Sequence, residues 1–159
     1  MILLAIDPGP EQSAYVLYDT EAKRPVAWAK VPNFDLLFGI ANVTADELSI
    51  EMIASYGMAV GAEVFETCVW IGRFIERWYA RGLRYYDHRL VYRRDVKLHL
   101  TGSPRANDAN VRQALIDRFG PGKEKAIGKK ASPGPLYGIK SDVWAALAVA
   151  ITAAETVAS

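Results

Sequence analysis

The sequence predicts an α/β fold in which helices flank a mixed β-sheet. Three strand-like runs fall within the first 31 residues and are separated by short turns, a spacing typical of an antiparallel meander. After residue 40, strand-like runs alternate with helical patterns, which favours a sheet covered by helices. A chain of 159 residues, of which 51% are hydrophobic and 23% charged, is expected to form one domain over residues 1–159.

The N-terminal half is predicted to contain most of the sheet. Residues 2–6 are apolar at every position, which is typical of a central strand buried on both faces. Turn residues at 8–11 and 19–25 then separate two further strands. The predicted elements of this half are strands at 2–6, 13–18, 26–31 and 48–53 and a short helix at 34–40.

The C-terminal half is predicted to be mainly helical. Gly102 and Gly120 mark the ends of two of its helices. Asp95 is a candidate cap for the first of these, and Asn107 or Asp108 for the second. The predicted elements are helices at 59–80, 95–100, 109–119 and 143–157, a strand at 84–92, and a mobile basic loop at 121–139 that is rich in glycine, proline and lysine.

Composition excludes several classes of protein. The net charge is +1, so binding to a polyanion would depend on local clusters of basic residues. The single cysteine, Cys68, excludes an internal disulfide and fits a reducing compartment. The N-terminal apolar run is too short for a signal peptide, and the apolar segment 143–154 is too short to span a membrane. We therefore expect a soluble, cytoplasmic protein with no membrane partner.

Three carboxylates fall where a charge is costly unless it is compensated. Asp7 ends the strand at 2–6, Glu51 lies within the strand at 48–53, and Asp142 directly precedes the last helix. A shared pair of Mg²⁺ ions, with Mn²⁺ as a substitute, would compensate them and suits chemistry on phosphates. Each acid also has a simpler interpretation, as a turn residue, a solvent-facing strand residue and a residue that favours the helix dipole, respectively.

Four short motifs follow one another along nearly the whole chain. They are Ile6-Asp7-Pro8-Gly9, then Ile50-Glu51, then Arg94-Asp95-Val96-Lys97 with Leu100-Thr101-Gly102, Ala106 and Val111, and finally Ala146–Thr152. In this order they resemble RuvC-type Holliday junction resolvases, within the ribonuclease H-like superfamily. The resemblance implies a five-stranded ribonuclease H-like sheet, Mg²⁺-dependent phosphodiester cleavage, and a homodimer that acts on four-way or other branched DNA.

The resemblance also implies roles for individual residues. By position, Asp7, Glu51 and Asp142 would bind the metal, and Lys97 would contact a DNA phosphate near the reacting group. Two positions depart from the family pattern. Ala145 stands where the last helix usually carries a further acid, one turn after Asp142, which puts a second metal ion in question. Asp108 stands where the family often has a lysine, and lysines of the 121–139 loop, such as Lys129 and Lys130, are hypothetical substitutes.

Other basic and aromatic residues are candidates for DNA contact. Arg93, Arg94 and Lys97 follow the predicted strand at 84–92, and Arg84 and Arg89 lie within it. Arg73, Arg77 and Arg81 would form a stripe on the helix at 59–80, interpreted either as a DNA contact or as a solvated face. Tyr56 could stack on an unpaired base or pack at a strand end. The helix at 59–80 carries more apolar surface than one sheet face requires, which is consistent with a subunit interface.

The predicted function is a structure-selective DNA endonuclease that cleaves four-way or other branched DNA with Mg²⁺. Two alternatives stay open. The acid missing at Ala145 favours a protein that binds junctions without cleaving them. The fold is also shared by other ribonuclease H-like nucleases, which act on other substrates.

Overall fold

The structure is a computed structural model and describes residues 1–82 and 88–156. Its central feature is a five-stranded sheet with strand order β3-β2-β1-β4-β5. The first three strands are antiparallel, and β1–β4 and β4–β5 are parallel pairs, so the predicted mixed sheet is confirmed. The strands are β1 (Ile2–Asp7), β2 (Gln12–Asp19), β3 (Arg24–Pro32), β4 (Glu47–Met52) and β5 (His88–Tyr92).

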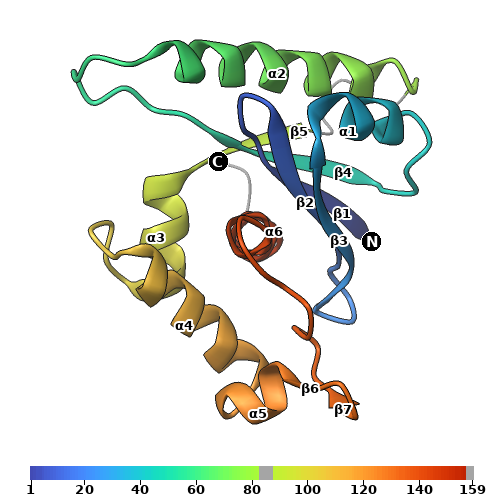
Figure 1. Ribbon diagram of the computed structural model, residues 1–159, viewed down its shortest axis with the longest axis vertical. Helices are drawn as coiled ribbons and strands as arrows, with labels where there is room; N and C mark the ends of the chain where they lie inside the picture. The colour runs from blue at the N-terminus through green and yellow to red at the C-terminus, as the bar shows by residue number, and fades with distance from the viewer. Residues whose placement is uncertain (83–87, 157–159) are drawn as a thin grey trace.

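Helices cover both faces of this sheet (Figure 1). The helices α1 and α2 lie on one face, while α6 lies on the other and separates the sheet from α3 and α4. The helices are α1 (Asn33–Ile40), α2 (Ala62–Tyr79), α3 (Arg93–Thr101), α4 (Asp108–Phe119), α5 (Gly122–Ala126) and α6 (Val143–Glu155). Part of the predicted strand at 84–92 and the end of the predicted helix at 143–157 lie outside the described residues. None of the helices formed by the described residues is long and apolar enough to cross a membrane.

Strand β1 is apolar throughout because both of its faces are covered. Leu3 and Ala5 pack in the core that includes α6, and Leu4 and Ile6 pack in the core that includes α1 and α2. All four side chains are at most 1% exposed. Alternation along the strand therefore points the next residue, Asp7, toward the α6 side.

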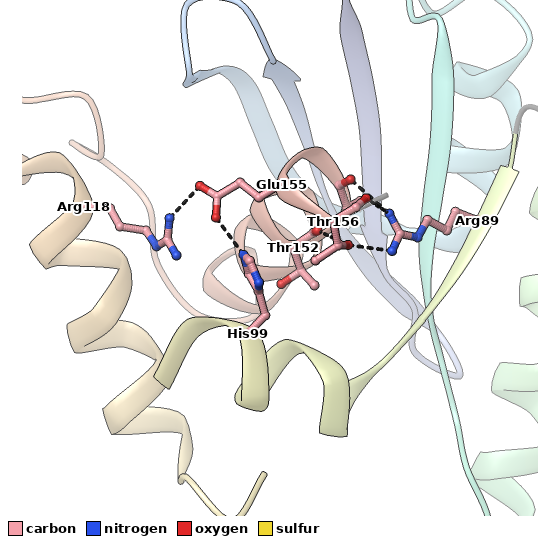
Figure 2. A network of polar contacts seen from close by, with 7 residues as sticks. Arg89, His99, Arg118, Thr152, Glu155 and Thr156 are labelled. Atoms are coloured by element: carbon pink, nitrogen blue, oxygen red, sulfur yellow. Dashed lines mark hydrogen bonds and ion pairs between the residues drawn. The ribbon is translucent and has the colours of Figure 1, made fainter. Parts of the chain in front are cut away.

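The C-terminal end of α6 is fixed by polar contacts from three other elements (Figure 2). Arg89 of β5 donates hydrogen bonds to the carbonyl oxygens of Ala153 and Thr156 and to the Thr156 hydroxyl. Glu155 accepts from His99 of α3 at 2.7 Å and from Arg118 of α4 at 2.5 Å. A cation at a helix C-terminus is favourable because it meets the unpaired carbonyl groups and the negative end of the dipole. These contacts fix the position of α6, and with it the start of the helix.

The segment 121–139 differs from the expected loop. It contains α5 and a short hairpin of β6 (Gly128–Lys129) and β7 (Ser132–Pro133). Ala126 and Leu136 are fully buried, and the Leu136 backbone N–H donates to the Ala126 carbonyl oxygen. The segment is therefore not a loop over its whole length, because a few small and apolar residues among the lysines dock it on the core that includes α6, while its mobility stays a prediction.

Two helix starts refine the sequence predictions. Asn107 caps α4 and shares a reciprocal capping box with Asn110, so Asn107 and not Asp108 is the cap. Helix α3 begins at Arg93, directly after β5, with no side-chain cap. The predicted cap at Asp95 is therefore wrong, and Asp95 lies in the first turn of the helix.

Candidate active site

A row of residues crosses the sheet on the side that faces α6. Asp7 pairs with Ala14 on β2, and Ala14 pairs with Lys30 on β3. On the other side of Asp7, the parallel register joins Ile6 to Ile50, so the next position brings Asp7 beside Glu51. Neighbouring strands lie roughly 5 Å apart, which brings the two acids within reach of each other. Ala14, which lies between Asp7 and Lys30 in this row, is fully buried in the core that includes α6.

The three predicted acids line one pocket. Asp7 reaches it from the end of β1, Glu51 from β4, and Asp142 from the residue before α6. Ala145 and Lys97 line the same pocket. The Glu51 side chain is only 14% exposed, so it does not face solvent. Helix α6 covers the sheet face on which it lies. The sequence interpretation of three convergent acids thus agrees with where the structure places them.

The charge of Asp7 is poorly compensated. Burial is the main cause that raises its pKa, and the carboxylates of Glu51 and Asp142 raise it further. Arg93 and Lys30 act in the opposite direction, and the resulting pKa is about 8. A carboxylate with this pKa is a protonated acid over much of the neutral range unless another positive charge enters the pocket. Strong perturbation of this kind is typical of functional sites.

Arg93, the first residue of α3, bridges two acids. Its guanidinium lies 3.4 Å from Glu51 Oε1 and 2.5 Å from Asp108 Oδ1. Burial raises the pKa of Glu51, and Arg93 lowers it in part. Asp108, which the sequence analysis considered as a helix cap, instead lines the pocket as a further carboxylate.

Lys30 pairs with Asp142. The Lys30 Nζ atom lies 2.6 Å from Asp142 Oδ2. Asp142 directly precedes α6, and its carboxylate makes no capping hydrogen bond to that helix. Lys30 was not predicted from the sequence, because its link to the site depends on the register of an edge strand.

The turn after Asp7 is held by a small buried network. The Gly9 N–H donates to the Ser13 hydroxyl, and that hydroxyl donates to Asn33 Oδ1 at 2.6 Å. The Asn33 side-chain amide donates in return to the Gly9 carbonyl oxygen at 2.9 Å. A side chain at position 9 would collide with the carbonyl oxygen of Gln12, which explains the glycine. The network fixes where Asp7 enters the pocket.

The donor set of the pocket fits a divalent metal ion. Four carboxylates, those of Asp7, Glu51, Asp108 and Asp142, are the hard oxygen ligands that Mg²⁺ and Mn²⁺ prefer. Burial and the carboxylates of Glu51 and Asp142 raise the pKa of Asp7, and a bound cation would favour its charged form. In the conformation described for residues 1–82 and 88–156, no group of three or more His, Cys, Asp or Glu side chains is arranged to hold a metal. Arg93 and Lys30 instead engage three of the carboxylates.

The predicted DNA-binding residues are not all brought to the pocket. Lys97 and Arg93 line it. Arg94 is exposed on α3, and Tyr56 is 68% exposed in the segment between β4 and α2. Lys129 and Lys130 are exposed at the β6–β7 hairpin and do not line the pocket, so the hypothesis that they replace the lysine at the Asp108 position gains no support there.

Several other basic residues of the sequence analysis serve the fold. Arg81 donates to the carbonyl oxygens of Val43 and Ala45, and its guanidinium lies over the ring of Trp78. Arg89 fixes the end of α6, as described above. The predicted stripe of Arg73, Arg77 and Arg81 is therefore wrong for Arg81, while Arg84 lies outside the described residues. Arg112, which the sequence analysis missed, lines the pocket and stacks on Trp144.

Two solved structures of RuvC from Thermus thermophilus superpose on this chain. One is RuvC itself, with a TM-score of 0.68 and 18% sequence identity, and the other is RuvC in complex with a Holliday junction substrate, with a TM-score of 0.66 and 17% identity. Each comparison covers 96% of this chain and 92% of RuvC. The chain has the RuvC fold. The predicted ribonuclease H-like fold is thereby confirmed. No family model matches the sequence, and no curated protein matches it.

Proposed function

We propose that this protein is a structure-selective DNA endonuclease that cleaves four-way or other branched DNA by metal-dependent phosphodiester hydrolysis. The observation that carries the proposal is the convergence of Asp7, Glu51 and Asp142 in one pocket of a RuvC fold. The solved complex of RuvC with a Holliday junction supports branched DNA as the substrate class.

In this proposal, Asp7, Glu51 and Asp142 hold the metal. A bound Mg²⁺ or Mn²⁺ ion would lower the pKa of a water molecule and offset charge on the reacting phosphate. Lys97 offsets the charge of the same phosphate from the wall of the pocket. Arg93 and Arg94 contact the flanking backbone, and the exposed Tyr56 stacks on an unpaired base at the branch point.

The protein acts as a homodimer in the same proposal. Phe34 and Phe38 on α1 and Phe65 and Val69 on α2 are each more than 50% exposed. Large apolar groups of this kind on one face of a molecule mark an interaction surface. Two copies joined there would act on two strands of one junction. Sedimentation of the wild type and of Phe38→Asp tests this, with a loss of the dimer expected in the variant.

The decisive experiment incubates a labelled four-way junction with the protein in Mg²⁺ or Mn²⁺. We expect cleavage by the wild type, and binding without cleavage by Asp7→Asn, because binding depends mainly on basic residues. Unlabelled linear duplex and RNA–DNA hybrid serve as competitors. Preference for the hybrid would indicate another ribonuclease H-like nuclease, and full nicking by Asp7→Asn would refute the role of Asp7.

One observation favours a second candidate, a protein that binds junctions without cleaving them. Ala145 lines the pocket one turn after Asp142 and supplies no ligand atom. Wild-type protein that binds the junction tightly and yields no product with either metal would establish this function.

A further inference from the structure

Lys30 neutralises a carboxylate that the proposed nuclease needs for its metal. It lies on the edge strand β3, in the row that also holds Ala14 and Asp7. Its ammonium group contacts Asp142 at 2.6 Å, and among the described residues this is the only ion pair of Lys30. The Lys30 side chain is 36% exposed and the Asp142 side chain 53% exposed, so the pair is open to solvent, and Asp142 lines the pocket.

Arg93 and Lys30, the two basic side chains that pair with acids of the pocket, differ in the number of ion pairs that they make. Arg93 would still pair with Asp108 if Glu51 turned toward a metal ion, because it contacts both acids. Lys30 makes no second ion pair within residues 1–82 and 88–156, although its charge also acts on Asp7. An exposed ion pair of this kind contributes little, so a divalent ion can displace the ammonium group from Asp142. The displaced Lys30 would then carry an uncompensated charge beside the place where DNA phosphates must lie.

We propose that Lys30 couples metal binding to DNA binding. Without metal, Asp142 neutralises Lys30 and keeps it from contacting DNA. With metal, Asp142 turns to the ion and Lys30 contacts a phosphate instead. The inference rests on the proposed nuclease function and adds a residue to it. Because binding free energies are reciprocal, DNA that engages Lys30 also tightens metal binding.

The first test is a calorimetric titration with Mn²⁺ alone. Removal of the competing cation in Lys30→Met should tighten Mn²⁺ binding about twofold to fivefold, the range expected from the free energy of one exposed ion pair. Lys97→Met is the matched control, because Lys97 lines the same pocket and carries the same charge but is not paired with Asp142. If Lys97→Met tightens Mn²⁺ binding as much as Lys30→Met does, the effect comes from the net charge of the pocket and not from the ion pair with Asp142. That result would overturn the proposal.

The second test measures how the affinity for a four-way junction depends on salt, with and without Ca²⁺. Each phosphate contact adds about 0.9 to the slope of log K against log salt. Addition of Ca²⁺ should increase the magnitude of this slope, and the increase should be larger for the wild type than for Lys30→Met by up to about 0.9. Lys97→Met should steepen as the wild type does, and Lys30→Arg should behave like the wild type. A gel confirms that the junction stays intact.

The outcomes separate this inference from the proposed function. If Ca²⁺ changes the slope equally in the wild type and Lys30→Met, the coupling is refuted even where the wild type cleaves junctions with Mg²⁺. If the slopes separate as expected and the wild type never cleaves, the nuclease function is refuted and the coupling stands. Thermal unfolding of each variant confirms that the substitutions leave the fold intact.

Discussion

The burial of Asp7 predicts a pH-dependent stability that one substitution should remove. The pKa of Asp7 is raised from 3.8 to about 8 in the folded protein. Between these two values the folded state keeps a proton that the unfolded state has lost, so the free energy of unfolding falls as the pH rises. The loss is complete above about pH 8. Asn at this position carries no charge at any pH, so Asp7→Asn should not show this loss.

The magnitude follows from the size of the shift. A difference of about 4 pKa units corresponds to about 5 kcal/mol, since each unit is worth 1.36 kcal/mol. We therefore expect metal-free Asp7→Asn to be more stable than the wild type by up to about 5 kcal/mol at pH 9. The two proteins should differ little at pH 4. Glu51, whose pKa is also raised, is present in both proteins, and its repulsion by the Asp7 carboxylate is removed in Asp7→Asn.

The assay is urea unfolding in EDTA from pH 4 to pH 9, followed by the fluorescence of the four tryptophans. Glu124→Gln, an exposed substitution on α5, is the control and should follow the wild type. Addition of Mg²⁺ at 100 times its dissociation constant should stabilise the wild type at pH 8 by about 2.7 kcal/mol. Identical pH profiles for the wild type and Asp7→Asn would refute the view that Asp7 is a buried, poorly compensated acid.

Three further predictions concern single residues. Ala145→Asp places a carboxylate one turn after Asp142 and should tighten Mn²⁺ binding about tenfold in calorimetry, while Ala145→Asn should not. Arg89→Met removes the hydrogen bonds at the end of α6 and should lower the free energy of unfolding by about 2–3 kcal/mol, while the exposed Arg94→Met should change it by less than about 0.5 kcal/mol. Tyr56→Ala should weaken binding to a four-way junction by about 1–3 kcal/mol but leave binding to linear duplex unchanged, whereas equal losses on both would argue against stacking at the branch point.

The sheet was predictable from the sequence because its signals are local. The continuous apolar run before Asp7 marks a strand covered on both faces, and the close turns after it mark a meander. The same reasoning failed for residues 121–139. Glycine, proline and lysine dominate that segment, and only the burial of Ala126 and Leu136 against the rest of the molecule shows that it is folded.

The acids of the pocket could be predicted from the sequence as candidate site residues, but the ion pairs that they form could not. That Asp7 and Glu51 lie at or near strand ends can be read from the chain, since both follow apolar residues. That the two strands are neighbours emerges only from the fold. The pairing of Lys30 with Asp142 joins an edge strand to a helix start 112 positions later, and it depends on the β2–β3 register and on how α6 lies on the sheet. No local pattern carries that information. Arg93 was predicted as a DNA contact from its charge alone, and the two acids beside it emerge only from the fold.

The two positions at which the sequence departs from the resolvases that it resembles, Asp108 and Ala145, line the same pocket. Ala145 brings no carboxylate to the first turn of α6, and Asp108 brings one at the start of α4. Four acids therefore line the pocket without one at position 145. The acid at Asp108 holds Arg93 at 2.5 Å, so it draws that guanidinium away from Glu51, which it meets at 3.4 Å. An arginine held in this way leaves Glu51 more available to a metal ion than a bidentate pair between Arg93 and Glu51 would. The pocket is thus acidic without a carboxylate at position 145, because Asp108 contributes one from the start of α4.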